Sequence, residues 1–102
     1  MPKPYYDLRT VKANILAGRV YLVHRKKNLA TLDDLGFADA DAFAEIANLK
    51  VTQFASTDWE RCRAADVYKK TILGRVIYIK FFIENDLVVL SFHHDGMRGT
   101  MK

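Results

Sequence analysis

Three residues in the last third of the chain have side chains suited to acid–base chemistry, namely Tyr78, Lys80 and His93. Histidine can accept or donate a proton near neutrality, and lysine carries a fixed positive charge. A tyrosine hydroxyl can donate a hydrogen bond or take part in proton transfer. Cleavage of an RNA phosphodiester without a metal ion needs a base, an acid and a cation. The three residues could supply this set, although the same types also occur on ordinary exposed sheet faces.

The segments that carry these residues predict a β-hairpin. Residues 77–83 and 87–93 both alternate in polarity, as strands with one buried face do. Asn85 and Asp86 between them form a good two-residue turn. Val88, Leu90 and Phe92 would then share one side of the second strand. Counting from the turn predicts five pairs: Ile83 with Val88, Phe81 with Leu90, Ile79 with Phe92, Lys80 with Ser91, and Tyr78 with His93. The last two pairs would gather the titratable groups on the face opposite the core.

The rest of the sequence predicts helices first and strands later. We expect a helix that begins at Asp7 and stops at Gly18, and a strand over residues 19–25. Residues 26–28 resemble a loop, and Thr31 looks like the N-cap of a short helix that ends at Gly36. Asp39 or Asp41 would cap a third helix. Strands follow at residues 53–63 and 67–73. This order predicts an α+β fold, an antiparallel sheet with helices on one face.

Composition limits the possible classes. The 102 residues predict one domain, 1–102, with flexible tails at 1–5 and 96–102. The chain has no apolar run long enough for a membrane span, no signal peptide and only one cysteine, which indicates the cytoplasm and no disulfide. We expect no metal and no cofactor. The net charge of +4 suits an acidic partner, either nucleic acid or an acidic protein.

Several short segments match a known family. They include Leu8-x-x-Val11-Lys12, Ala17-Gly18-Arg19-Val20, Leu35-Gly36-Phe37, Ile46-Ala47-Asn48-Leu49, Phe54 with Ser56, Asp66-Val67-Tyr68, Tyr78-Ile79-Lys80 and Leu90-Ser91-Phe92. Through these segments the chain resembles the motility quorum-sensing regulator (MqsR) toxins, mRNA interferases of type II toxin–antitoxin systems. The resemblance runs from Tyr6 to about His93, and the stretch from Asp66 to Phe92 is its most specific part.

The resemblance implies a RelE-like α+β fold and a cytoplasmic, ribosome-independent ribonuclease that cleaves mRNA around GCU. It also implies a cognate antitoxin, zinc-binding and with a helix-turn-helix domain. Through the antitoxin, the complex would bind operator DNA. Tyr78 and Lys80 match the family pattern, whereas His93 stands where the family usually has lysine. A family lysine before Ser56 is absent, some relatives have a glutamine where this chain has Ala65, and the segment from Phe54 to Tyr68 looks shortened.

From these observations we expect an endoribonuclease with Tyr78, Lys80 and His93 as catalytic residues and a 2′,3′-cyclic phosphate product. Arg61, Arg63, Arg75 and Lys69 are candidate phosphate contacts, and Tyr68 is a further candidate RNA contact. Because histidine titrates near neutrality, activity should vary between about pH 5 and 8. The alternative is a catalytically weak binding module that acts by binding an antitoxin or nucleic acid in operon regulation.

Overall fold

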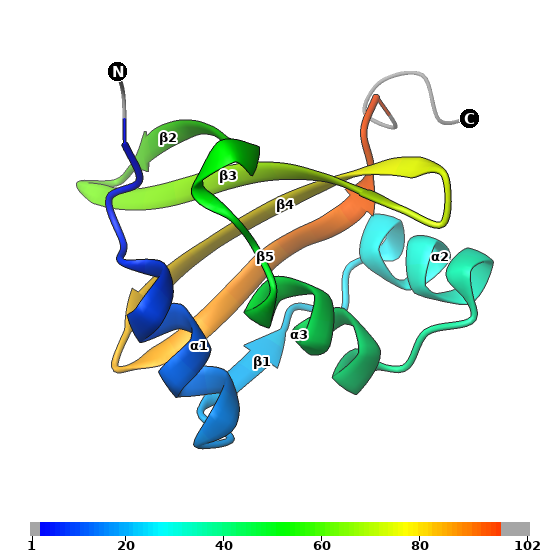
Figure 1. Cartoon of the computed structure of the whole chain (residues 1–102), viewed down its shortest axis with the longest axis horizontal. Coiled ribbons are helices and arrows are strands. Elements are labelled where there is room, and N and C mark those ends of the chain that lie inside the picture. The colour runs from blue at the N-terminus through cyan, green and yellow to red at the C-terminus, as the bar shows by residue number, and fades with distance from the viewer. Residues whose placement is uncertain (1–2, 97–102) are drawn as a thin grey trace.

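The structure is a computed structural model, and it describes residues 3–96. Figure 1 shows its helices and strands. The elements, in chain order, are α1 (Leu8–Leu16), β1 (Val20–Leu22), α2 (Lys26–Leu35), α3 (Asp39–Ala47), the 3₁₀ turn η1 (Val51–Gln53), β2 (Phe54–Glu60), β3 (Arg63–Ile72), β4 (Arg75–Glu84) and β5 (Asp86–His94). None of these helices is long and apolar enough to cross a lipid bilayer.

The five strands form one sheet in the order β1-β5-β4-β3-β2. The pairs from β2 to β5 are antiparallel, whereas β1 pairs with β5 in parallel. The α+β class is therefore confirmed, and the architecture is consistent with a RelE-like fold. The predicted antiparallel sheet is confirmed for β2 to β5, and β1 adds one parallel pair to it. This strand is only three residues long and lies at the edge of the sheet.

The helices cover one face of the sheet. Figure 1 shows α1 and α3 against that face and α2 near the end of β5. Buried side chains from all three helices join the main core, for example Val11, Leu32 and Ile46. Ile77, Ile79 and Phe81 of β4 meet them from the sheet. Tyr78 and Lys80 point to the opposite side, which we call the open face. The predicted division between a core face and an open face is confirmed along β4.

Two helix starts differ from the sequence prediction. Asp7 does cap α1, because its carboxylate accepts a hydrogen bond from the Arg9 backbone N–H at 2.8 Å. The second helix, however, begins at Lys26, so residues 26–28 are helical and Thr31 is an interior, buried residue. The N-cap of α3 is Ala38, and Asp41 accepts a hydrogen bond from the Ala38 backbone N–H at 2.8 Å. The predicted end of α2 at Gly36 is confirmed.

The turn that joins β2 to β3 lies inside the segment 53–63, which the sequence predicted as a single strand. Arg61 and Cys62 both adopt positive φ angles, 51° and 65°, and reverse the chain. Strand β3 consequently starts at Arg63 rather than at Val67. Neither turn residue is the glycine or asparagine that usually marks such a turn, so the pattern did not reveal it.

The register of the β4–β5 hairpin is correct at the site and wrong near the turn. Tyr78 pairs with His93 and Lys80 with Ser91, as predicted. Nearer the turn Ile83 pairs with Leu87 rather than Val88, because Asn85 alone, at φ 70°, lies between the paired residues Glu84 and Asp86.

A bulge on β5 reconciles the two registers. Phe81 pairs with Val89 and Lys80 with Ser91, so Leu90 is the additional residue. Because side chains alternate along a strand, the bulge moves Val88 and Leu90 away from the core that contains Phe92. Our assignment of Val88 and Leu90 to the side of Phe92 is therefore wrong.

The start of the described chain is tied to the sheet through Asp66, which is fully buried. The Asp66 carboxylate accepts hydrogen bonds from the backbone N–H groups of Tyr5 and Tyr6, at 3.0 and 2.8 Å, and from the Thr57 hydroxyl at 2.6 Å. Of the predicted flexible tails, residues 1–2 and 97–102 lie outside the described residues. Tyr5, which was predicted to lie in the first tail, is held by the hydrogen bond from its backbone N–H to Asp66.

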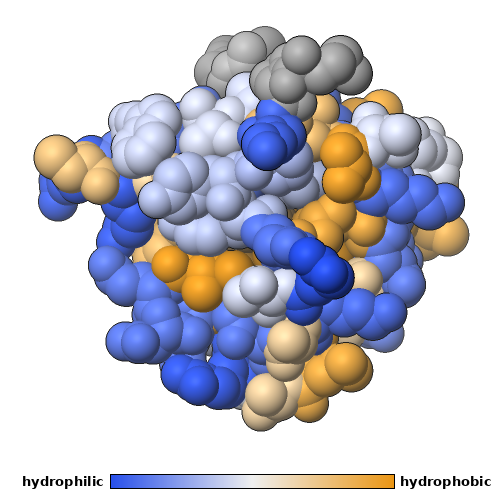
Figure 2. Space-filling view, turned by 60° about the vertical axis from the view of Figure 1, so that its left-hand side comes forward, coloured by the Kyte–Doolittle hydropathy of each residue, from blue (hydrophilic) through white to orange (hydrophobic). Residues whose placement is uncertain are grey.

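The surface is mixed in character. Figure 2 shows hydrophobic side chains in separate patches divided by hydrophilic ones on the side of the molecule that it presents. Large hydrophobic side chains such as Leu16, Trp59 and Leu73 are exposed. Trp59 makes an edge-to-face contact with Tyr5, 5.5 Å between ring centroids. Trp59 is therefore part of the packing around the anchored N-terminal segment.

Candidate active site

Tyr78 and His93 lie face to face on the open side of the sheet. Their rings are 5.2 Å apart between centroids with an angle of 14° between the planes, a stacked arrangement. The stack follows from the β4–β5 register, which sets the two residues directly opposite one another. The central pair of the sequence prediction is thus brought together on a rigid part of the sheet.

The stack borders a hollow of about 550 Å³, which we call the open-face concavity. Four cations, one acid and several hydroxyl groups line it together with the two rings. Its lining residues are Arg25, Lys27, Ala55, Ser56, Val67, Lys69, Tyr78, Lys80, Ser91, His93, Asp95 and Gly96. Within residues 3–96, no three histidine, cysteine, aspartate or glutamate side chains gather in the arrangement of a metal site.

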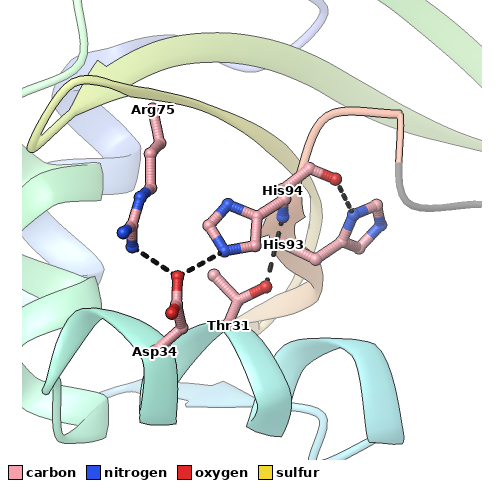
Figure 3. Close-up of polar contacts among 5 residues, drawn as sticks. All are labelled: Thr31, Asp34, Arg75, His93 and His94. Atoms are coloured by element: carbon pink, nitrogen blue, oxygen red, sulfur yellow. Dashed lines mark hydrogen bonds and ion pairs between the residues drawn. The ribbon is translucent and has the colours of Figure 1, made fainter. Parts of the chain in front are cut away.

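The hydrogen bond of His93 determines which nitrogen carries its proton. Nδ1 lies 3.0 Å from the backbone carbonyl of His94. A carbonyl only accepts hydrogen bonds, so Nδ1 must be protonated, and in the neutral ring Nε2 then carries the lone pair. Figure 3 shows this contact, with the two histidine rings on different sides of the strand. His93 is therefore held in the tautomer of a base at Nε2.

The surroundings of His93 favour its neutral form. The side chain is buried, and burial lowers the pKa of its imidazole below the ordinary value of 6.5. The positive charges of Lys27 and Arg25 lower this pKa further. The His94 carbonyl and Asp95 act in the opposite direction without reversing the shift. His93 thus enters the neutral pH range as an unprotonated imidazole.

Lys80 lines the concavity, but its charge is already paired. Its ammonium group lies 3.2 Å from the carboxylate of Asp58 and in direct contact with that of Glu60. Burial favours a lower pKa for Lys80, but the hydrogen bonds that its ammonium group donates to the two carboxylates outweigh burial and raise the pKa above its usual value. The same contacts lower the pKa of Glu60. Lys80 is therefore a permanently charged member of an ion cluster with two acids.

The other predicted phosphate contacts are spread over the molecule. Lys69 does line the concavity, where it pairs with Asp95 at 3.4 Å. Arg63 lies over the ring of Phe82, 3.7 Å from its centroid, and Arg61 occupies the β2–β3 turn. Neither arginine lines the concavity.

Arg75 also lies away from the concavity, in a polar cluster beside α2. Its guanidinium contacts the carboxylate of Asp34, which His94 also contacts at 2.9 Å (Figure 3). The backbone N–H of His94 donates to the Thr31 hydroxyl at 3.2 Å. The bond to Thr31 therefore fixes the backbone whose carbonyl holds the His93 ring.

Tyr68 is a core residue, and our assignment of an RNA contact to it is wrong. The side chain is fully buried, stacked on Phe81 and in edge contact with Phe54. Burial raises the pKa of its hydroxyl well above the ordinary value. Tyr68 lies on the core side of β3, because the residue before it, Val67, faces the concavity.

Two cations of the site were missed from the sequence. Arg25 and Lys27 belong to the basic segment 24–27, which is not among the phosphate contacts predicted from the sequence. They reach the concavity because α2 begins there and its first turn lies beside the end of β5. The start of α2 could not be recognised from the sequence, because its N-cap residue, Arg25, makes no side-chain capping hydrogen bond.

Comparison with known protein families finds a match over most of the chain. No curated protein matches the chain. The family model described as motility quorum-sensing regulator, toxin of MqsA, matches residues 3–94. A toxin of this kind implies an antitoxin as its partner. Since the match covers nearly all of the 102 residues, the chain belongs to the MqsR family of toxins from toxin–antitoxin systems.

Proposed function

We propose that this toxin is an endoribonuclease that cleaves single-stranded mRNA at the open-face concavity, independently of the ribosome, and that a cognate antitoxin neutralises it. The observation that carries the proposal is the stacked Tyr78–His93 pair, in which His93 is buried, neutral and protonated at Nδ1. The family membership supports the toxin role on independent grounds. By resemblance to the family, we expect GCU-like cleavage sites and a zinc-binding, helix-turn-helix antitoxin.

The chemistry follows from the two facing side chains. Nε2 of His93 takes the proton from a ribose 2′-hydroxyl, and the 2′-oxygen forms a bond to the adjacent phosphorus. The bond from phosphorus to the 5′-oxygen breaks, and the Tyr78 hydroxyl gives its proton to that leaving oxygen. The products are a 2′,3′-cyclic phosphate and a 5′-hydroxyl end. Transfer of the proton from the imidazolium to the phenolate, through water, resets the site.

Positive charge near the reacting phosphate is the third requirement. Lys69 faces the concavity and lies beside Tyr78 in the β3–β4 register. Lys80 is adjacent on β4, although Asp58 and Glu60 compensate its charge. We therefore assign Lys80 the role of fixing β2 against the site and leave charge compensation at the phosphorane to the other cations.

Expression in cells deprived of the antitoxin separates the proposal from its rival. The wild type should stop growth and leave mRNA with new 5′-hydroxyl ends, whereas Tyr78→Phe should cut about 10²-fold more slowly because it lacks the phenolic proton. Tyr21→Phe is the matched control, because it removes an exposed tyrosine hydroxyl outside the concavity. Normal growth and intact mRNA with well-folded wild type would contradict the proposal.

The pH profile of cleavage should follow the neutral form of His93. A base works only when unprotonated, so activity is present above its pKa and is lost as pH falls through it, roughly tenfold per unit. Because burial and the nearby cations lower this pKa, the midpoint of the acidic limb should lie below 6.5. Initial rates on one RNA from pH 4.5 to 8 test this. A rate that falls as pH rises across that range would show that the protonated form is needed.

The rival function is a weakly catalytic module that acts by binding an antitoxin or nucleic acid. The observation in its favour is the pairing of Lys80 with two acids, which compensate the positive charge of a residue predicted from the sequence to be catalytic. A binding module would leave RNA intact in the expression experiment while still associating with the antitoxin.

A further inference from the structure

The free positive charge of the concavity is concentrated at one end. Lys69 and Lys80 are each paired with carboxylates. Within residues 3–96, Arg25 and Lys27 form no ion pair, although both line the same hollow. The charge that is not in an ion pair therefore lies where α2 begins, and Arg25 is close enough to Glu60 of β2 to contribute to the lowered pKa of that carboxyl.

The same end of the concavity borders the N-terminus of α2. Arg25 is the N-cap of this ten-residue helix, and no side chain caps the first turn. Figure 3 shows that turn on the side of His93 and away from Asp34. Unpaired N–H groups and the helix dipole give a helix N-terminus partial positive charge and an affinity for anions. Two charged side chains and the helix terminus thus point to one kind of ligand.

A buried hydroxyl gives an independent indication. Ser91 is only 5 % exposed and lines the concavity, and its side chain has no hydrogen-bond partner within residues 3–96. His93, 7 % exposed, likewise bonds only through Nδ1 in this part of the chain. Neither the Ser91 hydroxyl nor Nε2 of His93 is among the fully buried, unbonded side-chain atoms of residues 3–96, so both groups are accessible from the concavity. Both can therefore hydrogen-bond to a molecule bound there.

We propose that Arg25, Lys27, the Ser91 hydroxyl and the first-turn amides of α2 form a subsite for a backbone phosphate of the RNA, next to the phosphate that is cleaved. The proposal rests on the proposed function and deepens it by giving the strand a direction across the open face. The backbone runs from the Tyr78–His93 stack toward α2, where the charge is free. Asp58 and Glu60 repel it at the β2 side. The effect of Lys27 and Arg25 on the pKa of His93 agrees with their closeness to the reacting group.

Replacing Lys27 tests the subsite with a closely matched control. Lys27→Gln and Lys26→Gln each remove one charge from the first turn of α2, but only Lys27 lines the concavity. The probe is an RNA with 2′-O-methyl groups throughout, which cannot be cleaved by 2′-oxygen attack. Lys27→Gln should weaken binding several-fold and reduce the slope of log Kd against log salt concentration by about 0.7, the value for one phosphate contact to a single strand. Lys26→Gln should leave the slope unchanged.

Inorganic phosphate tests the site without RNA. In wild-type protein it should shift the amide resonances of residues 26–28 and the imidazole resonances of His93, and in Ser91→Ala these shifts should need several-fold more phosphate. If phosphate binds there but the wild type cuts no RNA, the subsite holds and the proposed function is wrong. If the wild type cuts RNA and the two lysine variants bind it equally, the subsite is wrong and the proposed function holds. Absence of the phosphate-induced shifts would also overturn the subsite.

Discussion

Replacing His93 by alanine should lower the rate of RNA cleavage by about 10²–10⁴-fold, the usual contribution of a general base. His93 is the buried imidazole of the site, and its Nδ1 hydrogen bond leaves Nε2 as the proton acceptor. Since the side chain lines the concavity, its removal should also leave room for a small molecule. Added imidazole should therefore restore part of the lost activity, which a purely structural role for His93 would not allow.

His94→Ala is the matched control for this variant. His94 is the next residue on β5, its ring contacts Asp34 away from the concavity, and its backbone carbonyl remains in place. We expect its rate to stay within a few-fold of the wild type. Initial rates of both variants on one RNA, with and without imidazole, make the comparison. Equal losses in the two variants, with no recovery by imidazole, would contradict the role of His93 as a base.

Replacing Asp66 by alanine should lower the free energy of unfolding by about 3 kcal/mol. The change leaves three donors without their acceptor: the backbone N–H groups of Tyr5 and Tyr6 and the hydroxyl of Thr57. Asp66 is fully buried, so water cannot fully replace the lost bonds without opening the packing of the N-terminal segment. Denaturant unfolding followed by circular dichroism measures the loss.

Two variants sharpen the stability prediction. Asp33→Ala removes an exposed carboxylate of α2 and should change the free energy of unfolding by no more than about 0.5 kcal/mol. Thr57→Val removes one donor while Asp66 keeps two, so its loss should be smaller than that of Asp66→Ala. An Asp66→Ala protein as stable as Asp33→Ala would show that the buried carboxylate does not hold the N-terminal segment in place.

The site could be predicted from the sequence where strand alternation and direct pairing decide the geometry. Both strands alternate regularly around Tyr78 and His93. The two residues therefore face one another as predicted, although the predicted turn was wrong. The predicted turn has two residues, whereas the observed turn has only one, Asn85. The bulge at Leu90 adds one residue to β5, so the pairing beyond it returns to the predicted register. Alternation alone does not show a bulge, so the sides of Val88 and Leu90 could not be read correctly.

Parts of the site that depend on tertiary contacts could not be predicted. Asp58 and Glu60, the two acids that pair with Lys80, lie on β2. Their position depends on a hairpin at Arg61 and Cys62 that has no typical turn residues. Lys27 reaches the concavity through a helix whose start has no capping side chain. In both cases the local sequence lacks the usual signal and packing of distant segments decides the structure.

The most direct test of the account is cleavage of a long mixed-sequence RNA by the purified protein in excess EDTA, with the new 5′ ends mapped. Wild-type protein should cut at a short shared motif and leave 5′-hydroxyl and 2′,3′-cyclic phosphate ends. Tyr78→Phe and His93→Ala should lose these cuts, while His94→Ala should keep them. Absence of cleavage by folded wild type, or the same cuts at full rate in His93→Ala, would contradict the claim that the Tyr78–His93 pair is a ribonuclease site.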